Sequence, residues 1–570
     1  MAETPSHGSW HGWLFGVLLL AALVRVVGIG YGLPLDLVPD ESALILAGVT
    51  MLSLRTLVPA LHPDAFSMLY YPPLIPYLNA LAFLPVLAVQ YRAGSFGSFE
   101  VFRAYLAERP ESLWLTARAL QVGVGTATVW LVAKIGSRLG GPRLGLAAAA
   151  FLALSFTHVV LSHFGKQWIV TVFLMTLVLW GSLAWSMRAG RMALLGAIAG
   201  LAFGANIAGG FAWLIVAGVW WYRNRAQGLR SMVDGRLLLA TLVCAAVAGL
   251  CVGLHWPYFH WLFTRAMRSG AYITWHEPKS LPGYLGAFGY MASILAMHEP
   301  VLAIFALIGA AVLLRQGRRA AVAGVAALSI SYITYLYICV HLESRYVVLL
   351  LPAFALLAGY GLHAAASSAL ARRHARWMSV GIALLFGING VWIARLDWLL
   401  TQPDTRLLAR TWIEANARGA CFLLSSGTSG VHVRRTDEAI ALQDRYGTLR
   451  MGEADRLRRM VPGSRARPGE ALAVNIQEWN EPSRTLAVVR KLVDQQRDAG
   501  RRVYAVVNYW TASTLSPLDH ALLRDGRLVQ RFENGVGDAQ VVHDFSQPLT
   551  VLFRMRRLGT TVDIYELAGG

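Results

Sequence analysis

Long apolar runs fill most of the first 400 residues and limit the folds open to this chain. A helix needs about 20 mostly apolar residues to cross a bilayer. Runs that approach or reach this length lie at 12–31, 113–133, 144–161, 168–187, 236–254, 299–314, 320–340, 346–366 and 377–396. A further uncharged run, 192–222, is interrupted by Asn206 and several glycines and predicts two short helices. The sequence therefore predicts a mostly α, polytopic membrane fold with about eleven transmembrane helices.

Charged residues are concentrated after the last apolar run. Residues 401–570 hold 43 of the 83 Lys, Arg, Asp and Glu residues, a density typical of a soluble domain. We therefore predict a transmembrane domain at 1–400 and a soluble α/β domain at 401–570. Within the soluble domain, apolar periodicity predicts helices at 405–417 and 484–498 and strands at 421–426, 503–508 and 561–567.

Basic residues between the apolar runs predict how the chain is threaded through the membrane. Fifteen of them occupy five short loops: Lys134, Arg138 and Arg143; Arg188 and Arg191; Arg223, Arg225, Arg230 and Arg236; Arg315, Arg318 and Arg319; Arg372, Arg373 and Arg376. Cytoplasmic loops carry an excess of Lys and Arg. We expect a cytoplasmic N-terminus and a periplasmic C-terminal domain in a bacterial inner membrane. The net charge of +19 then reflects topology, and no nucleic acid partner is expected.

Two apolar runs near the N-terminus need a specific interpretation. The first run follows no basic segment and precedes no clear small-residue cleavage site, so we interpret it as a retained span. Residues 72–90 are long enough to cross the membrane, but a span there would turn every basic loop outward. We therefore place 72–90 as an interfacial helix within a first outer loop, 32–112. Prolines at its start suit a helix entry.

Several residues with chemical potential fall on the predicted outer side. Asp40 and Glu41 directly follow the first span, where a carboxylate pair is costly to keep without a purpose. Transfer of a sugar to a hydroxyl needs a base, which an aspartate at this boundary supplies. A phosphate leaving group needs cationic neighbours, and Lys166 and Arg345 lie in outer loops suited to that role.

Other outer-loop residues complete the candidate site. We expect His62, Asp64, His276 and Glu277 to line the substrate cavity. No His, Cys and Asp grouping has metal-ligand spacing, and the four cysteines form no CxxC motif, so no cofactor is predicted and metal dependence stays open.

Each of these residues also has a simpler structural interpretation. Asp40 can cap the next helix, with Glu41 in its first turn. Arg345 and Lys166 can extend toward lipid headgroups. Histidines in aromatic loops, such as His276, are more often structural than catalytic.

The combination of motifs is more specific than any single residue. Proline, aspartate and glutamate at 39–41 are followed by PPLIPY at 72–77, by LTARAL around Arg118 and by ESRYVVLLLPAFALLAGYGL at 343–362. Over residues 10–400 this arrangement resembles the GT-C glycosyltransferases, in particular the protein-O-mannosyltransferase and aminoarabinose-transferase-like family (glycosyltransferase family 39). The likeness extends weakly to DTRLLARTWIEAN at 404–416.

The resemblance implies a fold, a donor and roles for individual residues. It implies a GT-C fold with an outward-facing cavity, a polyprenyl-phosphate-linked sugar as donor, membrane lipid around the chain, and inverting transfer by single displacement. The acceptor would be a protein, a lipid or a glycan. Asp40 would be the base with Glu41 beside it, Arg345 and Tyr346 would contact the phosphate, and Tyr71, Pro72 and Pro73 would lie near the cavity.

Two departures from the family pattern weaken the inference about substrate. Many relatives carry His or Lys where this chain has Tyr71. Many also carry an aspartate shortly after the third span, whereas this chain reads HFGKQWIV at 163–170. A second acidic role would then fall to Asp64 or Glu277. A lipid or polysaccharide transporter and a non-catalytic envelope-assembly subunit therefore stay open as alternatives.

Overall fold

The structure, a computed structural model, describes residues 7–34, 37–58, 61–62, 72–262, 264, 277–340, 342–368, 373–425, 430–446, 470–476, 482–510, 515–524, 526–536, 545 and 547–567. The chain forms two compact units. Unit 1 contains Met1–Ile29, Ala43–Leu84 and Thr116–Leu396. Unit 2 contains Gly30–Ser42, Pro85–Leu115 and Asp397–Gly570. The segment that follows the first helix therefore belongs to the same unit as the C-terminal region. The predicted division at residue 400 stays a prediction.

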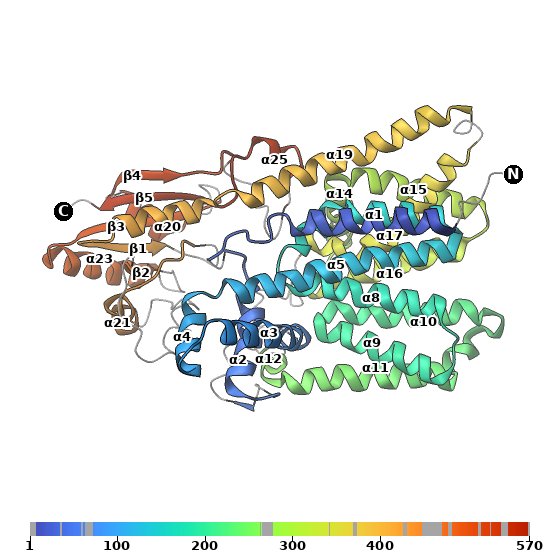
Figure 1. Cartoon of the computed structure of the whole chain (residues 1–570), viewed down its shortest axis with the longest axis horizontal. Helices are drawn as coiled ribbons and strands as arrows, with labels where there is room; N and C mark the ends of the chain where they lie inside the picture. The colour runs from blue at the N-terminus through green and yellow to red at the C-terminus, as the bar shows by residue number, and fades with distance from the viewer. Residues whose placement is uncertain are drawn as a thin grey trace. The chain divides into compact units, whose positions relative to one another are not determined.

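Apolar helices build the membrane part of the chain (Figure 1). Their bounds are α1 (His7–Val26), α2 (Glu41–Leu54), α3 (Leu74–Ala93), α5 (Glu111–Gly140), α6 (Pro142–Ala153), α7 (Phe156–Ser162), α8 (Gln167–Ala184), α9 (Ala189–Ala205), η3 (Ile207–Phe211), α10 (Ala212–Arg223), η4 (Arg225–Val233), α11 (Gly235–Leu254), α12 (Trp256–Trp261), α14 (Leu281–His298), α15 (Pro300–Arg315), α16 (Arg319–Cys339), η6 (Ser344–Leu350), α17 (Leu351–Ala366) and α19 (Ala375–Thr401). Each predicted span contains one of these helices, which confirms a polytopic, mostly α fold.

Fewer helices than predicted are long enough to cross a membrane on their own. Among the described residues, seven pass by length and composition, or up to nine if each of two bent pairs counts as one span. Shorter apolar helices are Trp10–Val26, which lies within α1, and α9, and η3 separates α9 from the 12-residue α10 at the predicted break. The helix α3, which the sequence analysis placed at the membrane surface, is also long and apolar enough to cross a membrane.

The helix α14 was not predicted from the sequence. It begins at Leu281, in the outer segment between the predicted spans 236–254 and 299–314, and joins α15 at a bend of 115°. Its start carries Pro282, Gly283 and Gly286, which lower helix propensity and favour a loop interpretation. The Ser280 side chain accepts a hydrogen bond from the Gly283 backbone nitrogen at 3.1 Å and caps the helix.

Glycines allow two pairs of helices in unit 1 to pack closely. A methyl group on Gly309 of α15 would collide with the Leu357 carbonyl of α17, and one on Gly361 would collide with the Phe305 carbonyl. Gly196 of α9 is similarly opposed by the Ala240 carbonyl of α11. Such contacts supply the van der Waals packing that holds helices together in lipid.

The break between α6 and α7, a bend of 61°, is stabilised by a charge at each helix end. Glu299, fully buried between α14 and α15, accepts hydrogen bonds from the Ser155 hydroxyl at 2.7 Å and the Thr157 backbone nitrogen at 2.9 Å. Arg25 donates to the carbonyls of Leu152 at 3.2 Å and Ala153 at 3.1 Å. The carboxylate thus meets the positive end of α7 and the guanidinium meets the negative end of α6.

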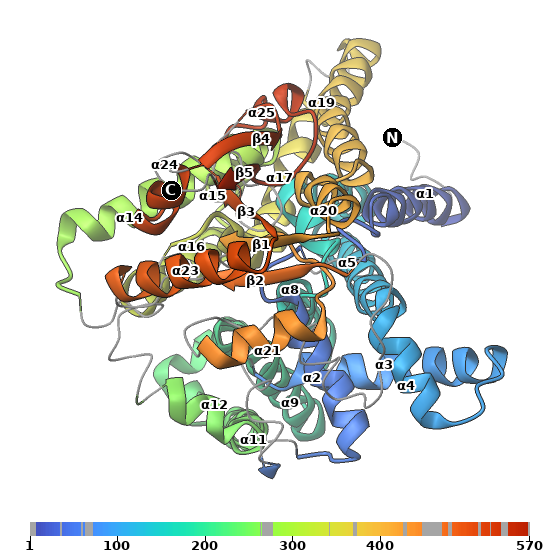
Figure 2. The ribbon, with the colours of Figure 1, turned by 90° about the vertical axis from the view of Figure 1, so that its left-hand side faces the viewer.

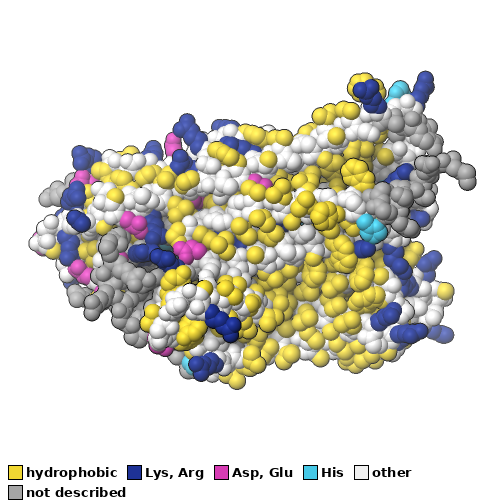
Figure 3. Space-filling view, viewed as in Figure 1, with side chains coloured by type: hydrophobic (Ala, Val, Ile, Leu, Met, Phe, Trp, Pro, Cys, Tyr) yellow, Lys and Arg dark blue, Asp and Glu magenta, His cyan; other side chains and the backbone are white. Residues whose placement is uncertain are grey.

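Basic loops gather at one end of the unit 1 helices, and Figure 3 shows Lys and Arg side chains beside a broad hydrophobic surface. Arg138 and Arg223 both donate to the Leu183 carbonyl at the end of α8, at 3.0 and 2.6 Å. Tyr360 donates to the Leu139 carbonyl at 3.0 Å and accepts from Arg318 at 3.1 Å. Four basic loops that the sequence placed on one side of the membrane therefore lie together.

Unit 2 is built around a five-stranded sheet in the order β2-β1-β3-β5-β4. The strands are β1 (Ala420–Ser425), β2 (Leu472–Ile476), β3 (Arg502–Tyr509), β4 (Gly526–Phe532) and β5 (Thr561–Leu567). The strand β1 is parallel to β2 and β3, whereas β5 is antiparallel to β3 and β4. The remaining helices are α4 (Phe99–Glu108), α20 (Thr405–Ala415), α21 (Asp437–Tyr446), α23 (Pro482–Asp498), α24 (Pro517–Arg524) and α25 (Val551–Arg554).

Helices cover both faces of this sheet (Figure 2). Cys421 and Leu423 pack against α21, α23 and α24, while Phe422 and Leu424 pack against α20. Successive residues of a strand point to opposite faces, so one apolar run serves two helix layers. The predicted α/β class is confirmed, as are the five predicted elements, to within a few residues.

Candidate active site

Asp40 and Glu41 lie at an unusual turn that leads into α2. The Glu41 backbone nitrogen donates to the Val38 carbonyl at 3.2 Å, and Asp40 has a φ of 64°. A helix N-cap normally has extended φ and ψ angles, so this backbone differs from the simple capping interpretation. The left-handed region is uncommon for residues other than glycine and often marks functional sites. Asp40 is half-buried, whereas Glu41 is fully buried.

The helix α2 packs tightly on the helix that follows the two prolines. A methyl group on Gly48 would lie 3.0 Å from the Pro76 carbonyl oxygen, and Asn79 donates to the Leu44 carbonyl at 3.2 Å. Pro72 and Pro73 are buried just before α3. Leu44 of α2 and Ile75 of α3 share an apolar cluster with residues of α8 and α9. The structure therefore brings the PPLIPY segment against the helix that begins with Glu41.

Lys166 and Arg345 come together in unit 1 although they are far apart in the sequence. Lys166 is 2% exposed and precedes the first turn of α8. Trp168 is two residues after Lys166, and its ring lies 5.9 Å from the Arg345 guanidinium and 5.1 Å from the Tyr346 ring. Arg345 also lies 5.2 Å from the Tyr346 ring and forms an ion pair with Glu343. All three predicted phosphate contacts thus lie around the start of α8.

These residues lie at the opposite end of α8 from the basic loops. The helix has 18 residues, which corresponds to about 27 Å at 1.5 Å per residue. Lys166 precedes its first residue, while the Leu183 carbonyl that binds Arg138 and Arg223 is near its last. This separation is close to the hydrocarbon thickness of a bilayer, about 30 Å.

The remaining predicted cavity residues are less closely associated with this group. His62 is half-buried after α2. Glu277 is exposed and lies 3.9 Å from Lys279, whose ammonium group lies 5.1 Å from the Tyr337 ring near the end of α16. Asp64, Tyr71 and His276 lie outside the described residues. Among the described residues, no group of His, Cys, Asp and Glu is arranged to hold a metal ion.

Two buried residues near this end of unit 1 were not predicted as site residues. Arg118 is fully buried, donates to the Ile29 carbonyl at 2.8 Å and lies 5.9 Å from the Phe164 ring. The ring nitrogens of His163 lie 2.8 Å from the Val27 carbonyl and 2.9 Å from the Val159 carbonyl. Both side chains thereby bind the backbone just after α1. The LTARAL motif was a visible signal for Arg118.

The pKa of His163 provides a prediction about pH. Burial lowers this pKa to about 4, and the positive charges of Arg25 and Arg118 lower it further. The two backbone carbonyls favour the charged ring, but their effect is smaller. Between pH 6.5 and 4 the unfolded chain takes up a proton that the folded chain does not, so stability falls as the pH falls. We expect a loss on the order of 3 kcal/mol once the pH reaches 4, of which about 2 kcal/mol falls between pH 7 and pH 5.

Melting of the purified protein in detergent at pH 7 and pH 5 measures this effect. The decrease in Tm between the two pH values should be smaller for His163→Gln than for wild type. The exposed His520 of α24 supplies the control, and His520→Gln should retain the full decrease. An equal decrease in all three proteins would contradict the assignment.

Comparisons with known proteins identify similar structures but no similar sequence family. No family model matches the chain, and no curated protein matches its sequence. The chain is similar to the crystal structure of ArnT from Cupriavidus metallidurans bound to undecaprenyl phosphate, with 15% identity over 99% of this chain and 100% of that chain and a TM-score of 0.45. The apo state of ArnT gives the same identity and coverage and a TM-score of 0.43.

A second neighbour comes from an archaeon. The oligosaccharyltransferase AglB from Archaeoglobus fulgidus, in complex with an inhibitory peptide and a dolichol-phosphate, is 12% identical over 99% of this chain and 89% of that chain, with a TM-score of 0.44. Both neighbours are GT-C glycosyltransferases, the class that the sequence motifs resemble.

Proposed function

We propose that this chain is a membrane glycosyltransferase that moves a sugar from a polyprenyl-phosphate-linked donor to an acceptor on the extracytoplasmic face. In this proposal Asp40 removes the proton from an acceptor hydroxyl, whose oxygen attacks the anomeric carbon. The bond between that carbon and the phosphate oxygen breaks, and polyprenyl phosphate leaves. A single displacement of this kind inverts the anomeric configuration.

The grouping of Lys166, Arg345 and Tyr346 at the start of α8 is the observation that carries the proposal. Lys166 is buried at the N-terminus of α8, and the dipole of a helix favours an anion at this end. A guanidinium and a lysine ammonium suit a phosphate, and a phosphate that leaves with two negative charges is stabilised by both. Glu343 forms an ion pair with Arg345 and balances part of the positive charge of the group.

The turn at Asp40 supports the role of base. A half-buried carboxylate remains accessible to a substrate, while the fully buried Glu41 does not. The φ of 64° directs this carboxylate differently from that of a capping residue. We therefore assign the proton transfer to Asp40 and a supporting role to Glu41.

The proposed orientation follows from the basic loops at the far end of α8. With those loops in the cytoplasm, the group around Lys166 lies at the outer boundary of the bilayer. The N-terminus is then cytoplasmic and the soluble α/β domain, 401–570, is extracytoplasmic. The bacterial inner membrane is the proposed location.

Sugar transfer by the purified protein in nanodiscs tests the proposal. Radiolabelled sugars on undecaprenyl phosphate are the first donors to supply, with an envelope extract as acceptor. Wild type should move label to the acceptor, and Lys166→Met should raise the KM for the donor about tenfold, because one charge-assisted contact to the phosphate is lost. The matched control is Lys491→Met, at an exposed position of α23, which should leave KM unchanged. Lack of transfer from every donor, with acceptor present, would reject the proposal.

A transporter is the second candidate, and the bent helices favour it. Transporters often carry broken helices near the middle of the membrane. The pairs α6–α7 and α14–α15 are both bent, and Glu299 connects their breaks. A transporter would move the intact lipid-linked sugar across the bilayer of a sealed vesicle without cleaving the sugar-phosphate bond. Recovery of intact donor in the opposite leaflet, with no free polyprenyl phosphate, would favour this alternative.

A further inference from the structure

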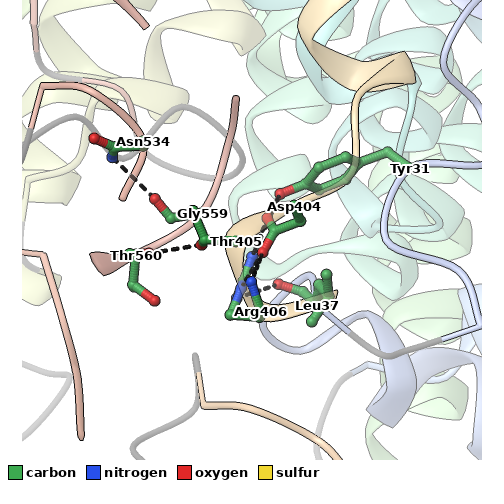
Figure 4. Close-up of polar contacts among 8 residues, drawn as sticks. All are labelled: Tyr31, Leu37, Asp404, Thr405, Arg406, Asn534, Gly559 and Thr560. Atoms are coloured by element: carbon green, nitrogen blue, oxygen red, sulfur yellow. Dashed lines mark hydrogen bonds and ion pairs between the residues drawn. The ribbon is translucent and has the colours of Figure 1, made fainter. Parts of the chain in front are cut away.

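A buried ion pair lies at the start of α20, outside the site described above (Figure 4). Asp404 and Arg406 are 0% and 1% exposed. The Arg406 guanidinium donates to both carboxylate oxygens of Asp404, from Nε at 2.8 Å and from its terminal nitrogen at 3.0 Å. The same carboxylate accepts the Arg406 backbone N–H at 2.8 Å and caps the helix. The pair is therefore rigid and fully shielded from water.

This ion pair binds the segment that follows the first membrane helix. The Tyr31 hydroxyl donates to the second carboxylate oxygen of Asp404 and accepts from Arg406 at 3.3 Å. Burial raises the pKa of this hydroxyl and the charge of Asp404 raises it further, so Tyr31 stays protonated and donates. Arg406 also donates to the Leu37 carbonyl at 3.2 Å. Two positions on either side of the 35–36 segment are thereby attached to α20.

The opposite side of the pair is fixed to the segment that enters β5. The Thr405 hydroxyl donates to the Thr560 carbonyl at 2.6 Å, and its backbone nitrogen donates to the Leu558 carbonyl at 3.1 Å. Gly559 has a φ of 108°, and a methyl group there would collide with Thr405 and Asp404. Asn534 donates to the Gly559 carbonyl at 2.9 Å. The segment that enters β5 thus holds the residue between Asp404 and Arg406 in place through two hydrogen bonds.

The attached segment leads directly to Asp40. Leu37 and Val38 are each 1% exposed, and the Val38 carbonyl accepts the hydrogen bond that closes the turn at Asp40. When the Leu37 carbonyl is held by Arg406, the backbone that sets the direction of the Asp40 carboxylate is held as well. All of these residues belong to unit 2.

We infer that Tyr31, Asp404 and Arg406 are positioning residues for the transfer reaction, because they hold the turn that presents Asp40. The inference rests on the proposed role of Asp40 as base. It also gives unit 2 a function, since the α/β region then forms part of the catalytic apparatus. Positioning matters because a displacement of about 1 Å at a reacting group can lower a rate about a hundredfold.

Tyr31→Phe tests the inference with the smallest change in shape. We expect this variant to lower kcat about tenfold or more, while the KM for the donor changes less than about twofold. Hydrogen exchange of backbone amides in 30–42 should become faster. In an Asp40→Asn background, Tyr31→Phe should cause no further loss of activity, because it acts through Asp40.

The matched control removes a hydroxyl from another carboxylate of unit 2. Tyr509 donates to Asp563 at 3.0 Å, and Asp563 is paired with Arg531. Tyr509→Phe should leave kcat and the exchange of 30–42 unchanged. Equal losses of kcat in both variants, or additive losses in the Asp40→Asn background, would overturn the inference.

Hydrogen exchange keeps the inference distinguishable from the proposed function. Absence of transfer by wild type would reject the proposed function and the catalytic role of the three residues. Unchanged exchange of 30–42 in Tyr31→Phe would overturn the positioning contact itself, whatever the activity of the protein.

Discussion

Replacing Asp40 with asparagine is expected to lower kcat for sugar transfer by about 10²–10⁴-fold, the range associated with loss of a general base. Asparagine has the same shape as aspartate and tolerates a positive φ comparably well. The turn, with its φ of 64°, should therefore be retained, and the change is confined to the ability to accept a proton. Steady-state transfer at saturating donor measures the effect.

The controls for Asp40→Asn address both folding and chemistry. Asp498 is exposed at the end of α23, and Asp498→Asn should retain wild-type kcat. The KM for the donor should change little in Asp40→Asn, since the proposed phosphate contacts are made by Lys166 and Arg345. Transfer that survives the substitution would reject Asp40 as base and direct attention to Glu41 and Asp64.

Removing Arg406 is expected to cause the largest loss of stability. Arg406→Met would leave the fully buried Asp404 carboxylate without its cation. Breaking one partner out of a buried ion pair typically costs about 3–5 kcal/mol. The free energy of unfolding of unit 2 should fall by this amount in urea, as followed by pulse proteolysis of the full chain in detergent.

An exposed ion pair in the same unit supplies the comparison. Arg527 lies 2.7 Å from Glu566, with its side chain 79% exposed. Such a pair contributes about 0–1 kcal/mol, so Arg527→Met should be nearly neutral. The double variant Asp404→Asn with Arg406→Met should be less destabilised than the sum of the single variants. Similar losses in Arg406→Met and Arg527→Met would show that the buried pair contributes little.

Much of the secondary structure was predictable because the pattern of apolar residues within a single segment is enough to indicate a helix or a strand. The strand β5 and the helix α23 follow from local alternation and periodicity, and both lie where the sequence placed them. The strand β4 was missed because GRLVQRF is short, largely exposed and rich in polar residues. The helix α14 was missed because proline and glycines at its start favour a loop, and its burial depends on the packing of distant helices.

The candidate site was predictable as a set of residues but not as an arrangement. Lys166 and Arg345 were selected individually by charge and position, and only the fold brings Arg345 to 5.9 Å from the ring of Trp168, two residues after Lys166. The positive φ of Asp40 has no signature in VPDESA. The contact of Tyr31 with Asp404 joins residues 373 positions apart, so no local pattern predicts it. Local chemistry is readable from sequence, whereas long-range contacts require the packed structure.

The hydrogen bonds of Glu299 have a consequence for how the protein is made. Ser155 precedes Glu299 by 144 residues, so α6 and α7 leave the ribosome long before their carboxylate partner exists. Until Glu299 is synthesised, the first turn of α7 needs another hydrogen-bond acceptor. Glu299 in turn needs these donors, because a charged residue within the bilayer is unfavourable by a few kcal/mol. Assembly of the two bent pairs therefore follows synthesis of the second pair. A nascent chain that stops before Glu299 would leave the Ser155 hydroxyl and the Thr157 backbone nitrogen without the acceptor that they have in the folded protein.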